Sequence, residues 1–386
     1  MICGPFFMPT VALPRWCTDS RAKDGVPWMQ TDFLIIGGGI AGVSAAANLS
    51  GLGSVILLEA EQNLAHHASG RSAALYEPHY GLPAVVELSL ASGDYLRGAK
   101  DVLSPRGMMI VGKVDEAAAM TAETRKFALD PISVDEARAM VPILNADIVK
   151  HASWGAHAWD IDTDLMLQGF ARQAKEGGAQ IITAARVTAI TRLPDGWQVS
   201  TSAGAFHARM IINAAGAWVD GIAHMAGVKP LGFQPMRRSM ARLPAPGGHD
   251  VSRWPMMFGV GEAWYAKPDA GALIVSPAEE DPMEPHDAWA DDMVLAEGLA
   301  RYEEMVSEPV TRLLSNWAGL RTFSPDRVLV IGPDPRVPSF FWLAGQGGYG
   351  FQSAPAAGQL VADLIAGRSS DLSGDLVKAL SPSRFK

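Results

Sequence analysis

Residues 33–59, FLIIGGGIAGVSAAANLSGLGSVILLE, decide the fold of this 386-residue chain. Phe33–Ile36 is a continuous apolar run, typical of a parallel strand buried on both faces, and Ser54–Leu58 has the same character. Between them, the glycine turn opens an alanine-rich helical run, Val43–Leu49, which Gly51–Gly53 ends. The segment therefore predicts a strand–turn–helix–strand unit.

The glycine turn of this unit has the spacing GxGxxG, which suits phosphate binding. Gly37 permits the tight turn, Gly39 lets the backbone approach a pyrophosphate, and Gly42 lets the helix pack against the strand. The helix N-terminus adds N–H donors and a positive dipole end. Glu59, at the end of the second strand, is placed to accept hydrogen bonds from an adenosine ribose, which favours FAD or NAD over NADP. A glycine-rich turn in another α/β protein is the alternative.

Composition limits the remaining function classes. Hydrophobic residues make up 48% and charged residues 19% of the chain, as in a folded enzyme, and the net charge of −9 argues against nucleic acid and anionic membrane partners. Cys3 and Cys17 cannot form a disulfide framework, which favours a reducing compartment. Residues 1–28 lack the pattern of a signal peptide, and we expect them to be an extension without a role in the chemistry.

Later glycine turns separate FAD from NAD. Ala205–Ile212 predicts a strand that leads into the turn Asn213–Trp218, and Phe340–Ala344 predicts another that leads into Gly345–Gly350. The helix that follows the last turn, from about Gln352, can stabilise the negative charge of a reduced flavin. Three glycine turns after buried strands, spread over the chain, fit an extended FAD better than a compact NAD site.

The ordered segments GGGIAG, LLEA, SGRSAA, INAAGAW, WAGLRTFSPD and AGQGGYGFQ resemble the D-amino-acid oxidase superfamily of FAD-dependent oxidoreductases. Within it, the segments LSPRGMMIV, DIDTD, GVKPLGFQPMRRS, WYAKPDAG and LSPSR resemble bacterial D-amino-acid dehydrogenases of the D-arginine type. The resemblance covers residue 30 to the C-terminus. It implies a mixed α/β fold, with a Rossmann-like FAD domain (29–80, 150–232 and 310–386) interwoven with a mixed-sheet substrate domain (81–149 and 233–309).

The resemblance also implies which residues form the site. FAD, held without a covalent bond, is expected to contact Gly37, Gly39, Ala41, Gly42, Glu59, Ala60, Ser69, Gly70, Arg71, Ser72, Ala73, Ala74, Val187, Ala215, Gly216, Gly347, Gly348, Gly350, Phe351 and Gln352. The substrate is expected to contact Arg321, Arg238, Tyr265, Tyr80, Tyr349 and Gly348. Arg321 matches the carboxylate-binding arginine of the family, because a guanidinium binds a carboxylate through two hydrogen bonds. Arg71 could neutralise pyrophosphate charge or be a solvated surface charge.

The implied reaction is oxidative deamination of a D-amino acid to a 2-oxo acid through the imino acid, with hydride transfer from Cα to the flavin. Two departures from the D-arginine type limit the substrate. Met108 stands where those enzymes have a glutamate that pairs with a cationic side chain, and Leu75 stands where they have a histidine. We therefore expect apolar side chains to be favoured over cationic ones. Lys267 shares a strand face with Tyr265, and a solvated strand end is its expected place.

Two other functions stay open. One is a sarcosine, N-methyl amino acid or secondary-amine oxidase, which shares the fold and the carboxylate-binding arginine; the other is a flavin-binding subunit of a heteromeric dehydrogenase. The expected partners are an amino acid and an electron acceptor, either oxygen or a quinone of the respiratory chain. The expected location is the cytoplasm, at most peripheral to the inner membrane. No CxxC, HExxH or carboxylate–histidine set has metal-ligand spacing, so no metal is expected, and a covalent flavin link at His66–His67 is disfavoured.

Overall fold

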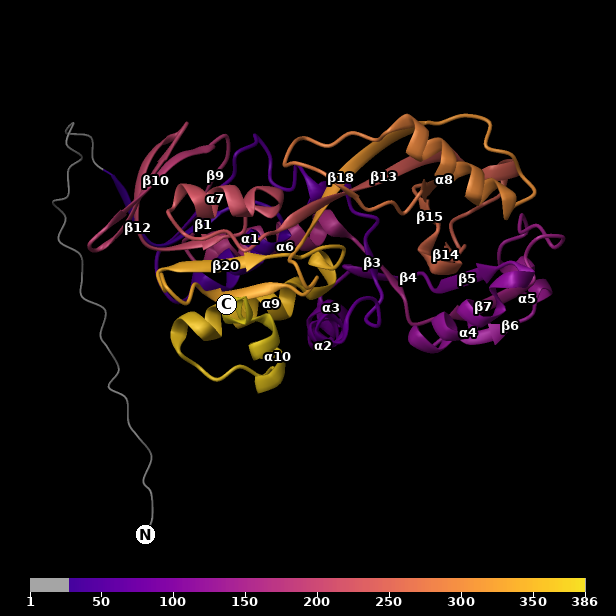
Figure 1. The fold of residues 1–386 in the computed structure, drawn as a ribbon, viewed down its shortest axis with the longest axis horizontal. Helices are drawn as coiled ribbons and strands as arrows, with labels where there is room; N and C mark the ends of the chain where they lie inside the picture. The colour runs from indigo at the N-terminus through magenta and orange to yellow at the C-terminus, as the bar shows by residue number, and fades with distance from the viewer. Residues whose placement is uncertain (1–27, 386) are drawn as a thin grey trace, which may run out of the picture.

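The computed structural model describes residues 28–385, which form two sheet-based halves joined by a small third sheet (Figure 1). The predicted extension lies outside the described residues except for Trp28. In the first half, an eight-stranded sheet has the order β10-β11-β12-β1-β2-β9, with β20 and β19 added beside β12. Its strands are β1 Met29–Ile36, β2 Val55–Leu58, β9 Gln180–Ile182, β10 Val187–Leu193, β11 Gly196–Thr201, β12 Gly204–Asn213, β19 Val330–Pro333 and β20 Phe340–Ala344.

The centre of this sheet is the unit that residues 33–59 predict. Strand β1 runs parallel to β2 on one side and to β12 on the other, and β9 runs parallel to β2. Helix α1 (Ile40–Leu49) connects β1 to β2, so that the glycine turn opens at the carboxyl end of β1. This arrangement is Rossmann-like and confirms the expected mixed α/β fold.

Helix α1 is buried on most sides because it lies against two other helices. It contacts α6 (Thr163–Glu176) and α9 (Gly350–Ala366), and eight of its ten residues are buried. A Cβ on Gly358 of α9 would lie 2.9 Å from the carbonyl oxygen of Ser44, so glycine lets the two helices approach closely. The small α7 (Val219–Met225) and α10 (Gly374–Leu380) complete this half. The alanine-rich sequence of α1 follows from this burial.

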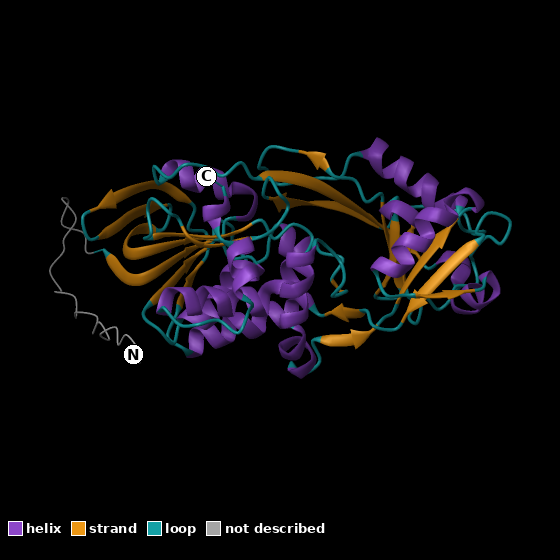
Figure 2. Cartoon of the chain, turned by 60° about the horizontal axis from the view of Figure 1, so that its bottom comes forward, coloured by secondary structure: helices purple, strands orange, loops and turns teal. Residues whose placement is uncertain are grey.

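The second half is built on a nine-stranded mixed sheet. Its longest pairing joins β13 to β18 in antiparallel fashion, whereas β14 runs parallel to β5. Helices α4 (Ala117–Lys126), α5 (Val134–Met140) and α8 (Asp292–Glu304) pack on its strands. The strands are β5 Met108–Gly112, β6 Asp130–Ile132, β7 His151–Gly155, β13 Gln234–Pro244, β14 Met256–Gly259, β15 Tyr265–Asp269, β16 Ala272–Ser276, β17 Asp281–Pro282 and β18 Ser315–Phe323. Figure 2 shows the two large sheets at opposite ends of the long axis.

A three-stranded antiparallel sheet lies where the chain crosses between the halves. It consists of β3 (Leu75–Tyr76), β8 (Trp159–Ile161) and β4 (Leu103–Pro105), in the order β3-β8-β4. Helices α2 (Pro83–Ala91) and α3 (Gly93–Gly98) follow β3 and pack on α9. Because the chain crosses between the two halves at this sheet, β3, β8 and the start of α9 lie in the same region.

Strand pairing assigns some segments differently from the predicted domain ranges. Strands β7 and β18 fall within ranges expected for the FAD domain, but both belong to the nine-stranded sheet of the second half. Conversely, α2 and α3 fall within the expected substrate domain, although they pack on α9 of the first half. Sheet membership depends on pairing between distant segments, which local sequence patterns do not specify.

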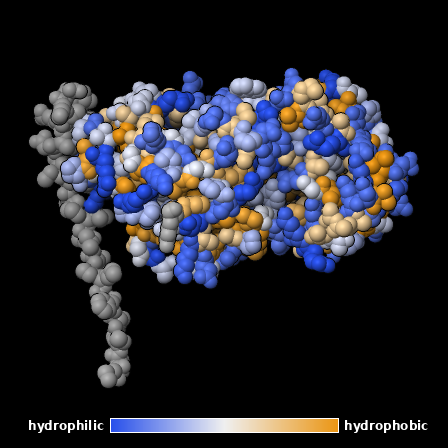
Figure 3. Space-filling model, viewed as in Figure 1, coloured by the Kyte–Doolittle hydropathy of each residue, from blue (hydrophilic) through white to orange (hydrophobic). Residues whose placement is uncertain are grey.

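The visible surface is mixed in character. In Figure 3, hydrophilic and hydrophobic residues are interspersed over the face shown. Among residues 28–385, no helix combines the length and hydropathy that crossing a bilayer requires. The stretch from Phe33 to Leu58 carries no charge, and it forms the strand–turn–helix–strand unit described above.

Candidate active site

Two adjoining cavities follow the carboxyl ends of the Rossmann-like strands. The first is lined by the glycine turn after β1, by the end of β2 and by the turn after β12. Of the predicted FAD residues, Gly37, Gly39, Glu59, Ala60, Ser69, Arg71, Val187, Ala215 and Gly216 line it. A second cavity shares Ala68, Ser69, Arg71, Gly319 and Leu320 with the first. Together they offer continuous walls for an extended dinucleotide.

The glycine turn has the geometry that phosphate binding requires. Gly37 has φ +114°, and a Cβ on it would collide with the carbonyl oxygen of Ala214. A Cβ on Gly42 would collide with the carbonyl oxygen of Gly37, so this position does not line the cavity but sets the turn. Glu59 accepts hydrogen bonds from the backbone N–H groups of Gly38 at 2.7 Å and Glu61 at 2.8 Å. Its carboxylate thus orders the turn, and ribose binding stays a prediction.

The second cavity has a helix N-terminus at one end. Gly347, Gly348 and Gly350 lie on its wall where α9 begins, together with Phe351 and Gln352. The segment Ser72–Ala74 also lines this cavity, and its small side chains leave space for a flat ring system. A helix N-terminus favours negative charge, as on a reduced flavin. The residues present therefore fit the ring system of FAD here and its nucleotide part in the first cavity.

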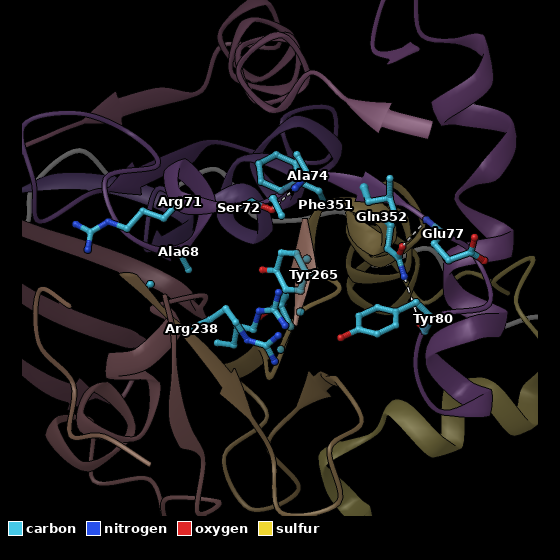
Figure 4. Close-up of a pocket in the computed structure, with 18 of the residues that line it drawn as sticks. Ala68, Arg71, Ser72, Ala74, Glu77, Tyr80, Arg238, Tyr265, Phe351 and Gln352 are labelled. Atoms are coloured by element: carbon cyan, nitrogen blue, oxygen red, sulfur yellow. Dashed lines mark hydrogen bonds between the residues drawn. The ribbon is translucent and has the colours of Figure 1, made fainter. Parts of the chain in front are cut away.

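Arg71 has a different environment from the one its motif suggests. In Figure 4 its guanidinium lies away from Tyr265 and Tyr80. Nη1 donates to the carbonyl oxygens of Ala288 and Ala318, each at 2.8 Å, and Nη2 pairs with Asp287. Its charge is therefore neutralised by the chain, and the side chain ties the turn at 68–71 to the segment before α8. A role in neutralising pyrophosphate stays a prediction.

Arg321 lies at the substrate end of the second cavity. It projects from β18, and its Nη1 is buried without a hydrogen-bond partner among residues 28–385. A Cβ on Gly348 would lie 3.2 Å from this Nη1, so glycine lets the guanidinium lie close under the loop. Burial lowers the pKa of Arg321, but Tyr265, Tyr80 and the acidic groups nearby outweigh it, so the net pKa is raised and the charge persists. An unpaired, buried guanidinium is suited to an anionic ligand.

Arg238, the second predicted substrate arginine, is already paired. Its Nη1 lies 3.0 Å from Glu262 and its Nη2 3.3 Å from Glu280, and its side chain is 4% exposed. The guanidinium lies 5.8 Å from the ring centroid of Tyr265. Because two carboxylates balance its charge, Arg238 shapes the cavity without offering a free cation.

Glu262 is the site residue that sequence reasoning missed. It lines the second cavity and accepts hydrogen bonds from the Tyr80 hydroxyl at 3.0 and 3.1 Å as well as from Arg238. Its φ of +54° places it in the left-handed region, at a turn that local sequence does not mark. Burial raises the pKa of Tyr80, and the charge of Glu262 raises it further, so the hydroxyl stays a neutral donor.

Much of the rest of the second cavity is apolar, although Glu77 and Gln346 also line it. Its walls include Leu75, Met108, Phe127, Met240, Met256 and Phe258, of which the sequence predicted the first two. The Tyr265 hydroxyl lies 3.3 Å from Sδ of Met240, so it is turned toward this wall. Tyr349 does not line the cavity but packs against Tyr80, with 5.3 Å between ring centroids. Methionine-rich walls accept apolar groups of varied shape.

Gln352 fastens the segment that carries Tyr80. Its Oε1 accepts the backbone N–H of Glu77 at 3.2 Å, and its Nε2 donates to the carbonyl oxygen of Tyr80 at 3.4 Å and to Ser89 Oγ at 3.0 Å (Figure 4). The side chain is 3% exposed. Gln352, a predicted FAD contact, thus also holds Tyr80, a predicted substrate contact, against α9.

The expectation of a solvated Lys267 is wrong. This residue is 7% exposed, and its Nζ lies 3.0 Å from Asp160 Oδ1 and 3.4 Å from the carbonyl oxygen of Ala74. Asp160 Oδ2 also accepts from Nε of Arg106 at 2.7 Å. The carboxylate therefore joins β8 of the small sheet to β15 and to the segment after β4.

Replacing Asp160 with alanine is expected to destabilise the protein by about 3 kcal/mol, because it leaves Lys267 and Arg106 without their shared carboxylate. Urea unfolding of the purified protein measures the change. The matched control is Asp164→Ala, which removes an exposed carboxylate from the first turn of α6 and is expected to cost less than about 1 kcal/mol. Equal effects of the two substitutions would contradict the buried linkage.

Comparison with known proteins identifies the family. A family model described as FAD dependent oxidoreductase matches residues 32–364. The chain belongs to this family. FAD is therefore its cofactor, in agreement with the two cavities. The family assignment confirms the FAD-dependent oxidoreductase expected from the sequence but leaves the substrate open.

Three similar proteins illustrate what the chain resembles. FAD-dependent oxidoreductase domain-containing protein 1 of Bos taurus is 25% identical over 403 residues, which cover 88% of this chain and 82% of that protein. N-methyl-L-tryptophan oxidase of Salmonella enteritidis PT4 is 25% identical over 373 residues, or 89% of this chain and 96% of the enzyme. The crystal structure of L-proline dehydrogenase from P. horikoshii shares the fold, with a TM-score of 0.79, 23% identity, and coverage of 93% and 98% of the two chains.

Proposed function

We propose that the chain oxidises a secondary-amine amino acid with an apolar side chain, of the N-methyl or cyclic kind. The observation that carries this proposal is Nη1 of Arg321, which has no hydrogen-bond partner among residues 28–385 and lies in a cavity with methionine-rich walls. A substrate that fits has one carboxylate for Arg321 and an apolar remainder for Met108, Met240 and Met256. This is the secondary-amine oxidase that the sequence left open as an alternative to a D-amino-acid dehydrogenase.

The hydrogen-bonding capacity of the cavity favours a secondary amine over a primary one. In the neutral form, which has the lone pair that the reaction needs, a primary amine brings two N–H donors, whereas a secondary amine brings one. The carboxylate of Glu262 already accepts from Tyr80 and Arg238, and Leu75 supplies no polar atom. Each buried donor left without a partner costs about 1–3 kcal/mol. The apolar walls instead suit an N-methyl group or a ring carbon.

The names of two similar proteins contain substrates of the same class. N-methyl-L-tryptophan and L-proline are both secondary amines, and they occur in the names of a relative and of a structure with the same fold. A D-amino acid specificity, which the sequence resemblance implies, has no such support in these comparisons. D-amino acids therefore serve as the competing substrates in the test.

The chemistry divides between cofactor and chain. Bound FAD supplies a two-electron hydride acceptor. Arg321 holds the substrate carboxylate, and the apolar walls exclude water and orient the carbon next to nitrogen. As a hydride leaves that carbon, the nitrogen lone pair forms the C=N bond of an iminium ion, which water then hydrolyses. Oxygen or a quinone as final electron acceptor stays part of the proposal.

Anaerobic mixing of the flavin-loaded protein with a substrate panel tests the proposal, with flavin absorbance near 450 nm as the readout. We expect N-methyl-L-tryptophan, sarcosine or L-proline to bleach the flavin at least about 10-fold faster than D-methionine or D-leucine, because each unsatisfied donor costs about a factor of ten in rate. D-arginine is expected to be slow, since Met108 offers no counter-charge. Faster bleaching by D-methionine than by every secondary amine would contradict the proposal and restore the D-amino-acid reading. No bleaching of bound flavin by any substrate would favour a subunit that needs a partner.

A further inference from the structure

A further group of chemistry-bearing side chains lies at the end of the three-stranded sheet, and one of its members, Glu77, also lines the second cavity. Glu77 and His79 follow β3, and His157 lies in the turn between β7 and β8. Because β3 pairs with β8 through Tyr76 and Trp159, the residues after β3 lie next to the residues before β8. Pairing of the two strands thus brings together side chains that are 80 residues apart in sequence, from 77 to 157.

The ligand atoms of these three side chains converge. Oε1 of Glu77 lies 3.0 Å from Nδ1 of His79, and Oε2 of Glu77 lies 3.2 Å from Nε2 of His157. One ligand atom from each residue lies within 4.8 Å of the others. Ligand atoms around a tetrahedral or octahedral zinc ion are about 3–3.5 Å apart, given zinc–ligand distances of about 2.0–2.2 Å. The two measured separations match this spacing.

Two of these atoms lack a hydrogen bond although they face one another. Glu77 Oε2 and His157 Nε2 are both buried, and neither has a hydrogen-bond partner among residues 28–385, because the angles between them do not suit one. Lone pairs that converge on a common point rather than on each other are arranged for a cation. A Cβ on Gly155 would lie 2.6 Å from Cε1 of His157, so glycine leaves the space that this imidazole occupies.

The charges around Glu77 also favour a bound cation. Its side chain is 4% exposed, and within the described part of the chain its only ion-pair partners are the two histidines, with no lysine or arginine. A buried carboxylate is costly unless a cation compensates it. His79 and His157 are 36% and 28% exposed, so an ion can enter from solvent between them. The backbone N–H of Glu77 donates to Oε1 of Gln352, which holds the backbone that carries the carboxylate.

We propose that Glu77, His79 and His157 form a binding site for a divalent first-row transition metal ion, with Zn²⁺ as its representative. Two imidazoles and a carboxylate suit zinc and its neighbours better than magnesium or calcium, which prefer oxygen ligands. Three protein ligands leave at least one position for water. The ion links the segment that carries Tyr80 to the turn between β7 and β8. This proposal does not depend on the identity of the amine substrate.

Equilibrium dialysis of the chelator-treated, flavin-loaded protein against Zn²⁺, with metal quantified by mass spectrometry, tests the site. We expect one Zn²⁺ per chain in the unchanged protein and its loss in both His157→Gln and His79→Gln. Thermal unfolding supplies an independent readout: a saturating concentration of Zn²⁺ is expected to raise Tm by at least about 2 °C in the unchanged protein and by less in the variants, because a ligand that binds only the folded state stabilises it.

The controls use histidines outside the site. His224→Ala changes an exposed residue of α7 and should leave zinc binding intact. His66→Ala disrupts the other histidine–carboxylate cluster of the described chain, His66, His67 and Asp287, and should also leave it intact. Unchanged flavin content shows that each variant is folded. Absence of bound zinc in the unchanged protein, unaltered binding in both glutamine variants, or loss of binding only in His66→Ala would each overturn the proposal.

Discussion

Replacing Arg321 with methionine is expected to lower kcat/KM for an N-methyl amino acid by about 10²–10⁴, because two charge-assisted hydrogen bonds worth about 1.5–3 kcal/mol each are lost. The Nη1 of Arg321 is buried and has no partner among the described residues, so the substrate carboxylate is the group that would satisfy it. Steady-state kinetics of the purified variant, with flavin content matched to the unchanged protein, measures the effect.

Kinetics with a substrate that lacks a carboxylate distinguish the loss of carboxylate binding from general damage to the enzyme. The unchanged enzyme is expected to prefer an N-methyl amino acid over the corresponding N-methyl amine, and Arg321→Met should abolish that preference. Arg321→Lys is the matched variant: it keeps the charge but loses the planar fork, so its loss should be smaller. A preference for the carboxylate that survives in Arg321→Met would show that another group binds it.

Replacing Gly42 with alanine is expected to weaken FAD binding by about 10–100-fold, because forcing an extra carbon into a packed position costs about 1–3 kcal/mol. A Cβ there collides with the carbonyl oxygen of Gly37, so the phosphate-binding turn must move away from its position over α1. Titration of the flavin-stripped protein with FAD, followed by flavin fluorescence, measures the affinity.

The control for this substitution is Gly51→Ala. Gly51 lies in the turn after α1, and a Cβ on it would meet no atom within 4 Å. Its FAD affinity should match that of the unchanged protein, and circular dichroism should show the same helix content in both variants. Wild-type affinity in Gly42→Ala would mean that the turn after β1 does not carry the pyrophosphate.

The contrast between Arg321 and Arg238 shows where sequence reasoning about the site ends. Both arginines are found in matching segments, and both line the same cavity. Only the fold brings Glu262 and Glu280 to Arg238 and leaves Arg321 without a carboxylate in direct contact among residues 28–385. The charge state of a site depends on partners from distant segments, and their distances are not encoded in the residues that flank each arginine.

Lys267 and His157 illustrate the same limit. The alternation along the strand Tyr265–Asp269 predicts which residues share a face with Lys267, but not that Asp160 from β8 lies against it. His157 joins Glu77 and His79 only because β3 pairs with β8, so a search for metal-ligand spacing along the chain misses the group. The domain ranges differ from the sheet membership of β7 and β18 for this reason too.

The sequence by itself determined the nucleotide-binding unit and the cofactor class. Residues 33–59 contain their strands, turn and helix within one continuous stretch, and the steric demand of Gly42 arises against Gly37, five residues earlier, whereas that of Gly37 arises against Ala214 of a distant segment. Tertiary structure alone decided which arginine lacks a partner within residues 28–385, which side chains line the second cavity and which histidines meet Glu77. These features depend on distances between segments separated by tens to hundreds of residues, and packing of the whole chain sets those distances.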